Sequence, residues 1–345
     1  MRGDALSQPP LQARMKPPLA SAPVTLDSIR APIASDMEQV DEVIRKRLDS
    51  DVALIRAVAS HIVAAGGKRL RPALVLLAAN AFAPEATARH ELAAVIEFIH
   101  TATLLHDDVV DESSLRRGRK TANAEFGNAA SVLVGDFLYS RAFQMIVEAG
   151  SLRIMKVLAD ATNTIAEGEV LQLLNVHDAD TEEEQYLRVI RYKTAKLFEA
   201  ATQVGAILGG ASREDERALA DYGMHIGTAF QLVDDALDYS GDLAETGKNL
   251  GDDLAEGKPT LPLIHVMRVG RDEERALVRH AIERGGKGDL SAVVAAIHRV
   301  GALDYTRARA REEAAMATAR IAHLADSACR DSLLQLAHFS VERRF

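Results

Sequence analysis

Two short acidic motifs hold the residues best suited to chemistry in this chain of 345 residues. Each has the form DDxxD and follows an apolar stretch. On a helix, residues i and i+4 lie on the same face, so the outer carboxylates of each motif would project together and repel each other. Such oxygen ligands suit a hard cation such as Mg2+, which retains water and phosphate ligands. The motifs comprise Asp107, Asp108 and Asp111 in DDVVD, and Asp234, Asp235 and Asp238 in DDALD.

The apolar residues before both motifs narrow the class of ligand. FIHTATLL precedes the first motif and FQLV precedes the second. A ligand that meets apolar side chains at one end and bound Mg2+ at the other must be both apolar and anionic, as a prenyl diphosphate is. The alternative interpretation is that each motif is only a hydrated helix face. The occurrence of two copies, both in apolar helical contexts, weighs against it.

Basic residues near the motifs could bind the phosphates of such a ligand, because arginine and lysine pair with phosphate oxygens. GGKRLRP places cations after a Gly-Gly turn, and a histidine lies seven residues before the first motif, two turns away on the same face. Further candidates lie in RYKTAKLFEA and in the glycine-rich stretch after the second motif. Ordinary solvated or core side chains are the alternative. These candidates are Lys68, Arg71, His100, Arg116, Arg117, Lys193, Thr194, Lys248 and Lys258.

The distribution of proline predicts that helices position these residues. Proline crowds the first 34 residues and is absent between Pro84 and Pro259. It disrupts helix interiors, and the intervening sequence is rich in good helix formers. With only 4% aromatic residues, strands are disfavoured. We predict a flexible tail over 1–34 and an all-α domain over 35–345. The expected helices cover 51–65, 70–83, 88–112, 120–148, 151–175, 181–210, 213–241 and 258–269, with another from Ser35 and shorter ones over 272–345.

Composition argues against several other classes of protein. The net charge of -9 opposes a general nucleic-acid binder. A single cysteine, Cys329, leaves no partner for an intrachain disulfide, so we expect a reducing, cytoplasmic setting. The sequence lacks a run of 18 apolar residues, which predicts that no segment spans a membrane. Its first residues lack the apolar core of a secretory signal, and a targeting role for the tail is the open alternative.

The chain resembles the trans-isoprenyl diphosphate synthases, or polyprenyl synthetases, over about residues 35–345. GGKRLRP, HDDVVDESSLRRG, FQLVDDALDY and GKNLGDDLAEGKPTLPL occur in that family's order and approximate spacing. The resemblance implies an isoprenoid synthase-type helical bundle around a deep central cavity, usually in a homodimer. It also implies a Mg2+-dependent transferase that condenses isopentenyl diphosphate with an allylic diphosphate such as farnesyl diphosphate.

The resemblance further implies that three Mg2+ ions bind with the allylic diphosphate. These ions and nearby cations would stabilise the departing diphosphate, so that the allylic C–O bond breaks. The double bond of isopentenyl diphosphate would attack the resulting cation, and a proton would leave to the departed diphosphate. The implied catalytic residues are Asp107, Asp108, Asp111, Asp234 and Lys193. The implied metal ligands are Asp107, Asp111 and Asp234, with Asp108, Asp235 and Asp238 beside them.

Roles in substrate binding come from the same resemblance. The residues implied for the allylic diphosphate are Arg116, Lys193, Thr194, Gln231, Lys248 and Lys258. Those implied for isopentenyl diphosphate, which binds without metal, are Lys68, Arg71, His100 and Arg117.

Product length in this family depends on the residues before the first motif. Ala102 and Thr103, five and four residues before Asp107, are both small, whereas members that make short products commonly have aromatic residues there. The chain therefore most resembles proteobacterial enzymes that make octaprenyl diphosphate for quinone tails, with possible transfer of the product at a membrane surface. Solanesyl or decaprenyl products stay open. So do three different functions, namely a class I terpene cyclase, a membrane prenyltransferase and a non-catalytic subunit of a heteromeric synthase.

Overall fold

The computed structural model describes the chain in five stretches, over residues 24–64, 67–83, 85–116, 118–240 and 250–342. Nearly all secondary structure in these stretches is helical, which confirms the predicted all-α class. The strands found there are one antiparallel pair, β1 (Leu115–Arg116) and β2 (Arg119–Lys120). This short hairpin follows the first acidic motif.

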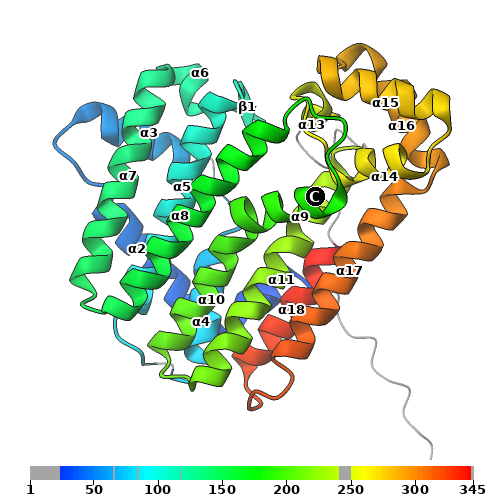
Figure 1. Cartoon of the computed structure of the whole chain (residues 1–345). Coiled ribbons are helices and arrows are strands. Elements are labelled where there is room, and N and C mark those ends of the chain that lie inside the picture. The colour runs from blue at the N-terminus through cyan, green and yellow to red at the C-terminus, as the bar shows by residue number, and fades with distance from the viewer. Residues whose placement is uncertain (1–23, 65–66, 84, 117, 241–249, 343–345) are drawn as a thin grey trace, which may run out of the picture.

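The helices follow one another with short connections, as Figure 1 shows. Those of the N-terminal half are α1 (Leu26–Arg30), η1 (Ala31–Ile33), α2 (Ala34–Arg47), α3 (Ala53–Ala64), α4 (Leu70–Asn80), α5 (Arg89–Val110), α6 (Ala122–Phe126), α7 (Asn128–Glu148) and α8 (Leu152–Asn175). Those of the C-terminal half are α9 (Glu183–Ile190), η2 (Arg191–Ala195), α10 (Lys196–Leu208), α11 (Arg213–Leu237), α13 (Asp252–Ala255), α14 (Leu261–Val269), α15 (Asp272–Arg284), η3 (Lys287–Asp289), α16 (Leu290–Arg299), α17 (Ala302–Arg320) and α18 (Ala328–Glu342).

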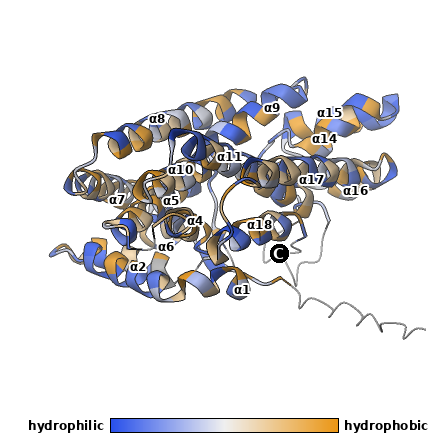
Figure 2. Cartoon of the chain, turned by 90° about the horizontal axis from the view of Figure 1, so that it is seen from below, coloured by the Kyte–Doolittle hydropathy of each residue, from blue (hydrophilic) through white to orange (hydrophobic). Residues whose placement is uncertain are grey.

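Helix α4 lies near the middle of the main bundle, as the view in Figure 2 shows. Its sequence LRPALVLLAAN is apolar on all sides, and most of its residues are buried, as expected for a core helix. Helices α5 and α10 pack against it. The contact with α10 requires glycine at position 205, because a Cβ there would lie only 2.5 Å from the Val75 carbonyl oxygen.

The two acidic motifs lie at the carboxyl ends of α5 and α11, and α10 packs against both helices. Helices α14, α15 and α16 stand beside the main bundle and share a separate apolar cluster (Figure 1). Helix α17 packs along α11 and also contacts α14 and α16. This second cluster therefore supports the segment that follows the second acidic motif.

Part of the predicted tail is folded. Residues 24–34 contain α1 and η1, and the side chains of Ile29 and Ile33 belong to the main core. The prediction of a flexible tail is therefore wrong for this stretch, whereas residues 1–23 lie outside the described residues. The error arose because a helix as short as α1 leaves little apolar periodicity to detect.

Two predicted helices are interrupted. The one expected over 120–148 is divided at Gly127, whose φ of 87° suits glycine far better than other residues. The one expected over 181–210 consists of α9, the π-helical turn η2 and α10. None of the helices in the described stretches is long and apolar enough to cross a membrane.

Candidate active site

The first acidic motif ends α5. Asp107 and Asp108 belong to its last turn, and Asp111 follows as the C-cap, whose N–H donates to the Asp107 carbonyl at 2.8 Å. Carboxylates are unfavourable at this end of a helix, where the aligned peptide dipoles place partial negative charge. Burial raises the pKa of Asp107, and the neighbouring Asp111 contributes to the rise. The motif therefore needs positive charge from elsewhere.

Lys193 supplies part of that charge from the π-helical turn η2. Its ammonium lies 3.6 Å from Asp107 Oδ2 and donates to Glu169 Oε2 of α8 at 2.6 Å. Turns of this type are rare and frequently occur at functional sites. Helix α8 can approach the turn because residue 168 is glycine. A Cβ at that position would lie 2.6 Å from the backbone nitrogen of Lys193. Burial raises the pKa of Glu169 to about 7, which shows how little the carboxylate is solvated.

Lys258 supplies a second positive charge from the loop after α13. It donates to Asp111 Oδ2 at 2.9 Å and pairs with Glu256 Oε2 at 2.5 Å. Burial alone would lower its pKa, but Asp111, Asp253 and Glu256 together raise that pKa above its ordinary value. Lys258 therefore stays protonated. The segment after the second acidic motif thus reaches the first motif directly.

Asp108, the middle residue of the motif, is bound by an arginine and not by these two lysines. Its side chain is buried, and Oδ1 accepts hydrogen bonds from Arg116 Nε at 2.9 Å and Nη2 at 2.7 Å. Both donors meet at one carboxylate oxygen, and the charges on the two groups strengthen these hydrogen bonds. Arg116, predicted to bind the allylic diphosphate, thus lies beside the motif and fixes its middle aspartate.

The second motif shows the same division of roles. Asp234 is partly exposed, whereas Asp235 is buried and accepts hydrogen bonds from the Tyr186 hydroxyl at 2.5 Å and from Gln231 Nε2 at 2.7 Å. Thr194 donates to the amide oxygen of Gln231 at 3.1 Å. Burial, and then Asp253, raise the pKa of Asp235 to about 7. Both oxygens of Asp235 accept hydrogen bonds within the protein, and Asp234 is the more exposed of the two carboxylates.

Asp238, the third acid of this motif, caps α11. Its backbone carbonyl accepts from the Gly251 N–H at 3.0 Å, and its Oδ2 accepts from the Asp253 N–H at 3.3 Å. These bonds hold the segment before α13 against the end of α11. Asp238 thus helps to fix the start of α13, the helix that Lys258 follows.

Two of the residues predicted for isopentenyl diphosphate, Arg71 and His100, are in contact. Arg71 Nη1 lies 3.1 Å from His100 Nε2, so α4 and α5 each supply one polar group. The Arg71 guanidinium lies 4.4 Å from the ring centre of Phe198, and the Lys68 ammonium lies 6.0 Å from that of Phe230. These two rings are 5.7 Å apart. Cations over aromatic faces are held by the ring quadrupole, and the sequence analysis did not identify this aromatic pair.

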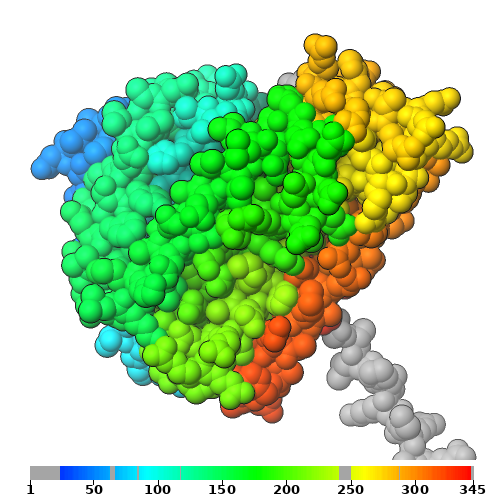
Figure 3. All heavy atoms as spheres, viewed as in Figure 1, coloured from blue at the N-terminus to red at the C-terminus, as the bar shows by residue number. Residues whose placement is uncertain are grey.

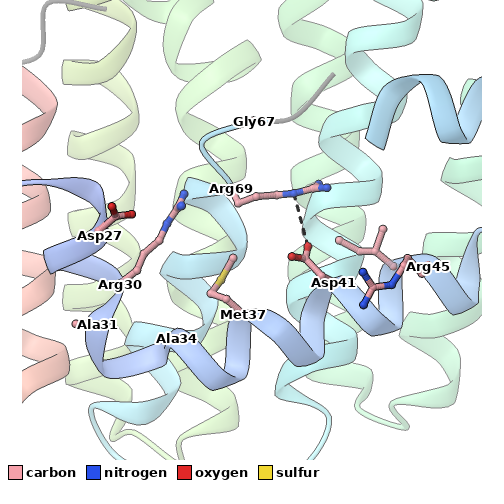
Figure 4. Close-up of a pocket in the computed structure, with 10 residues that line it drawn as sticks. Asp27, Arg30, Ala31, Ala34, Met37, Asp41, Arg45, Gly67 and Arg69 are labelled. Carbon is pink, nitrogen blue, oxygen red and sulfur yellow. Dashed lines mark ion pairs between the residues drawn. The ribbon is translucent and has the colours of Figure 1, made fainter. Parts of the chain in front are cut away.

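Arg69, the middle cation of GGKRLRP, points elsewhere. It donates to the buried Glu97 at 2.6 Å and lies 4.0 Å from Asp41 of α2. Figure 4 shows it beside a cavity of about 590 Å³ that α1 and α2 line, with Arg30 reaching in from α1. This cavity borders the turn at Gly67 and is lined by no residue of either acidic motif. The turn therefore sends Arg69 to one side, while Lys68 and Arg71 meet the aromatic pair.

The remaining predicted residues are placed as follows. Ala102 is fully buried in the main core, and Thr103 is partly exposed and donates to the His100 carbonyl at 2.8 Å. Arg117 and Lys248 lie outside the described residues. Besides the aromatic pair, the sequence did not indicate Glu169, Glu256 or Tyr186 as residues of the site. The only signal for the first two was a glutamate next to glycine in EGEVLQ and AEGKP, which is too common a pattern to indicate a site.

The donors at the acidic motifs fit Mg2+ in their chemistry. They are carboxylate oxygens, and Mg2+ usually takes one or two of them with waters and substrate phosphates. Asp107 and Asp111 are one helical turn apart, and burial raises the pKa of Asp107 even though Lys193, Arg116 and Lys258 act to lower it. Within the described stretches, no three acidic, histidine or cysteine side chains are grouped so as to hold a metal ion by themselves.

Comparison with known proteins agrees with this site. The family model described as polyprenyl synthetase matches residues 52–299. The octaprenyl diphosphate synthase of Escherichia coli K12 is 54% identical over 93% of this chain and 99% of that protein. The all-trans-nonaprenyl-diphosphate synthase of Rhodobacter capsulatus is 48% identical over 91% of this chain and 97% of that protein. A crystal structure of a polyprenyl synthase from Caulobacter crescentus, complexed with calcium and isoprenyl diphosphate, superposes with a TM-score of 0.90 at 45% identity, covering 93% of this chain and 98% of that chain.

Three findings agree with the four motifs and with the two lysines at the first of them. They are the match to the family model, the relatives aligned over most of their length, and the shared fold. The chain belongs to the polyprenyl synthetase family.

Proposed function

We propose that the protein is a Mg2+-dependent trans-prenyltransferase that adds isopentenyl diphosphate units to an allylic diphosphate and makes octaprenyl diphosphate. One observation carries the proposal: the first acidic motif, a lysine from the π-helical turn and the lysine after the second motif meet at one place. Bound Mg2+ would supply positive charge that stabilises the departing diphosphate. The 54% identity to an octaprenyl diphosphate synthase supports the product length.

The residues of the chain divide the work of that reaction. Asp107, Asp111 and Asp234 would hold three Mg2+ ions, and the two lysines would bind the allylic diphosphate. Preorganised cations lower the barrier to breaking the allylic C–O bond, because they already lie near the oxygen where negative charge develops. Arg71 and His100 would hold isopentenyl diphosphate so that its double bond attacks the allylic carbon. A proton then leaves the condensed product to the departed diphosphate.

The direct test is incubation with farnesyl diphosphate, radiolabelled isopentenyl diphosphate and Mg2+, followed by chromatographic sizing of the dephosphorylated product. We expect a ladder that ends at the octaprenyl alcohol. A longer end point would correct the product assignment, and the absence of any elongated product would favour a non-catalytic subunit. A cyclic hydrocarbon made without isopentenyl diphosphate would indicate a terpene cyclase, a function disfavoured by the contact between Arg71 and His100.

Substitution of Lys68 or Arg71 by alanine should weaken binding of isopentenyl diphosphate far more than binding of the allylic substrate. Both cations lie over the aromatic pair and not at the aspartates. A charge-assisted hydrogen bond is worth roughly 1.5–3 kcal/mol, which corresponds to about 10-fold to 100-fold in KM. Steady-state KM values for both substrates measure the effect. Equal increases in the two KM values would contradict separate binding sites.

We propose that two copies of the chain associate through α7 and α8, which lie side by side on the face in view in Figure 3. Among the large apolar side chains that are exposed in the described stretches, half belong to these two helices. Exposed apolar side chains gathered on neighbouring helices favour a protein contact. They are Val132, Leu133, Val147, Leu152, Val170, Leu173 and Leu174.

Sedimentation equilibrium should give twice the chain mass of 37.3 kDa. Leu133→Ser combined with Leu173→Ser should shift the mass toward one chain, because it removes apolar area from the contact. A wild-type mass of one chain at micromolar concentration would contradict the dimer.

We further propose that the enzyme is cytoplasmic and passes its product on at a membrane surface. The single cysteine is compatible with a reducing compartment.

A further inference from the structure

The two lysines at the first acidic motif share one arrangement. Each ammonium lies between an aspartate of the motif and a glutamate from a different element. In each case the glutamate is the nearer partner, at 2.6 Å in one and 2.5 Å in the other. We call them the α8 bridge, formed by Asp107, Lys193 and Glu169, and the α13 bridge, formed by Asp111, Lys258 and Glu256.

The glutamates are not needed to neutralise charge. The α8 bridge and the α13 bridge each contain two carboxyl groups and one ammonium, so the aspartate of each bridge could neutralise its lysine without the glutamate. Both glutamates are largely shielded from water, with side-chain exposures of 29% for Glu169 and 27% for Glu256. Shielding an additional carboxyl group from water has a free-energy cost, which its contact with the lysine must offset.

When a metal ion binds the aspartates, the glutamates would retain the lysines at the site. A Mg2+ ion held by Asp107 or Asp111 would compete with the lysines for the carboxylate oxygens that they contact. A lysine side chain has four rotatable bonds and loses much entropy when it is fixed. The glutamates lie outside both acidic motifs, so they can keep their hydrogen bonds while the aspartates bind metal. Each lysine would then stay at the site, where its other N–H groups can reach a diphosphate.

We propose that Glu169 and Glu256 are positioning residues, each of which holds the ammonium of its own lysine at the diphosphate site while the paired aspartate binds metal. This inference rests on the proposed function, since it assumes that a diphosphate binds at the first motif. It predicts that each glutamate acts only through its own lysine. A glutamate that merely stabilises the fold would not show that dependence.

A double-mutant cycle on each bridge tests the proposal through the Kd of inorganic diphosphate, measured by calorimetry with saturating Mg2+. We expect Glu169→Gln to weaken binding about tenfold, which corresponds to ~1.4 kcal/mol. In a Lys193→Met background the same change should have less than about a twofold effect. Glu256→Gln and Lys258→Met should behave in the same way. Losses that multiply within a bridge would overturn the proposal.

Crossed pairs and a matched variant serve as controls. Glu169→Gln combined with Lys258→Met joins two different bridges, so its losses should multiply. Glu167→Gln removes the same charge from α8, but this exposed side chain accepts from Asn163 at 2.9 Å, and its Kd should match that of wild type. An equal loss in Glu167→Gln would show a general charge effect and contradict positioning.

The outcomes separate this inference from the proposed function. Wild-type protein that elongates farnesyl diphosphate, with losses that multiply within each bridge, would overturn only the positioning role. Wild-type protein that makes no product but shows coupling within each bridge would overturn the synthase and leave a diphosphate site with positioned lysines. Thermal melting of each variant without ligand excludes unfolding as the cause of a weaker Kd.

Discussion

Asp107→Ala and Asp234→Ala should each lower kcat by several orders of magnitude with Mg2+ present. Each change removes a carboxylate that we assign to the metal ions around the departing diphosphate. Loss of a single oxyanion donor already costs about 100-fold to 1,000-fold in other enzymes. The loss of a metal ligand should cost more, because the ion carries more charge than one hydrogen-bond donor.

Folding should not suffer in Asp107→Ala. The pKa of Asp107 is raised by burial, so its ionised form is destabilised in the folded protein. Removal of that carboxylate also relieves its repulsion with Asp111. We therefore expect an unchanged or higher melting temperature beside the loss of turnover. Asp160→Ala is a matched control, since Asp160 forms an exposed pair with Lys156 on α8. Near-normal single-turnover rates in either active-site variant would refute the metal assignment.

Part of the geometry of the acidic motifs follows from their spacing. Successive residues on a helix are turned by about 100°, so the second aspartate of DDxxD lies about 100° from the first, whereas the last lies within about 40° of the first. At both motifs the second aspartate is bound within the protein, Asp108 by Arg116 and Asp235 by Tyr186. The two middle residues share one geometry, and the partner of each could not be read from the sequence.

Long-range pairings explain most of what sequence reasoning missed. The helices were predictable because their apolar periodicity is local, and α5 runs over 89–110 against the expected 88–112. Contact between Lys258 and Asp111 joins residues 147 positions apart. Glu169 reaches Lys193 only because a π-helical turn and a glycine bring two helices together. No local pattern specifies such a turn, because its sequence RYKTA has ordinary helix propensity.

The last prediction concerns product length. Thr103 lies four residues before Asp107 on α5, about 6 Å further from the metal site at 1.5 Å rise per residue. Its side chain is partly exposed, whereas Ala102 is fully buried in the main core. Thr103→Phe should therefore place a ring in the path of the growing chain, and Ala102→Phe should mainly overpack the core, at about 1–3 kcal/mol. We expect Thr103→Phe to stay folded and active but to stop at much shorter prenyl diphosphates.

The measurement is the product ladder after dephosphorylation, with wild type beside each variant. Thr103→Val is the matched control, because it keeps the volume and removes only the hydroxyl that donates to the His100 carbonyl. It should still give the full-length product. If Thr103→Phe shortens the product and Thr103→Val does not, added volume and not the lost hydrogen bond controls length. A folded, active Thr103→Phe enzyme that makes the full-length product would show that the growing prenyl chain does not pass this residue. Product length would then have to be limited by residues of another helix.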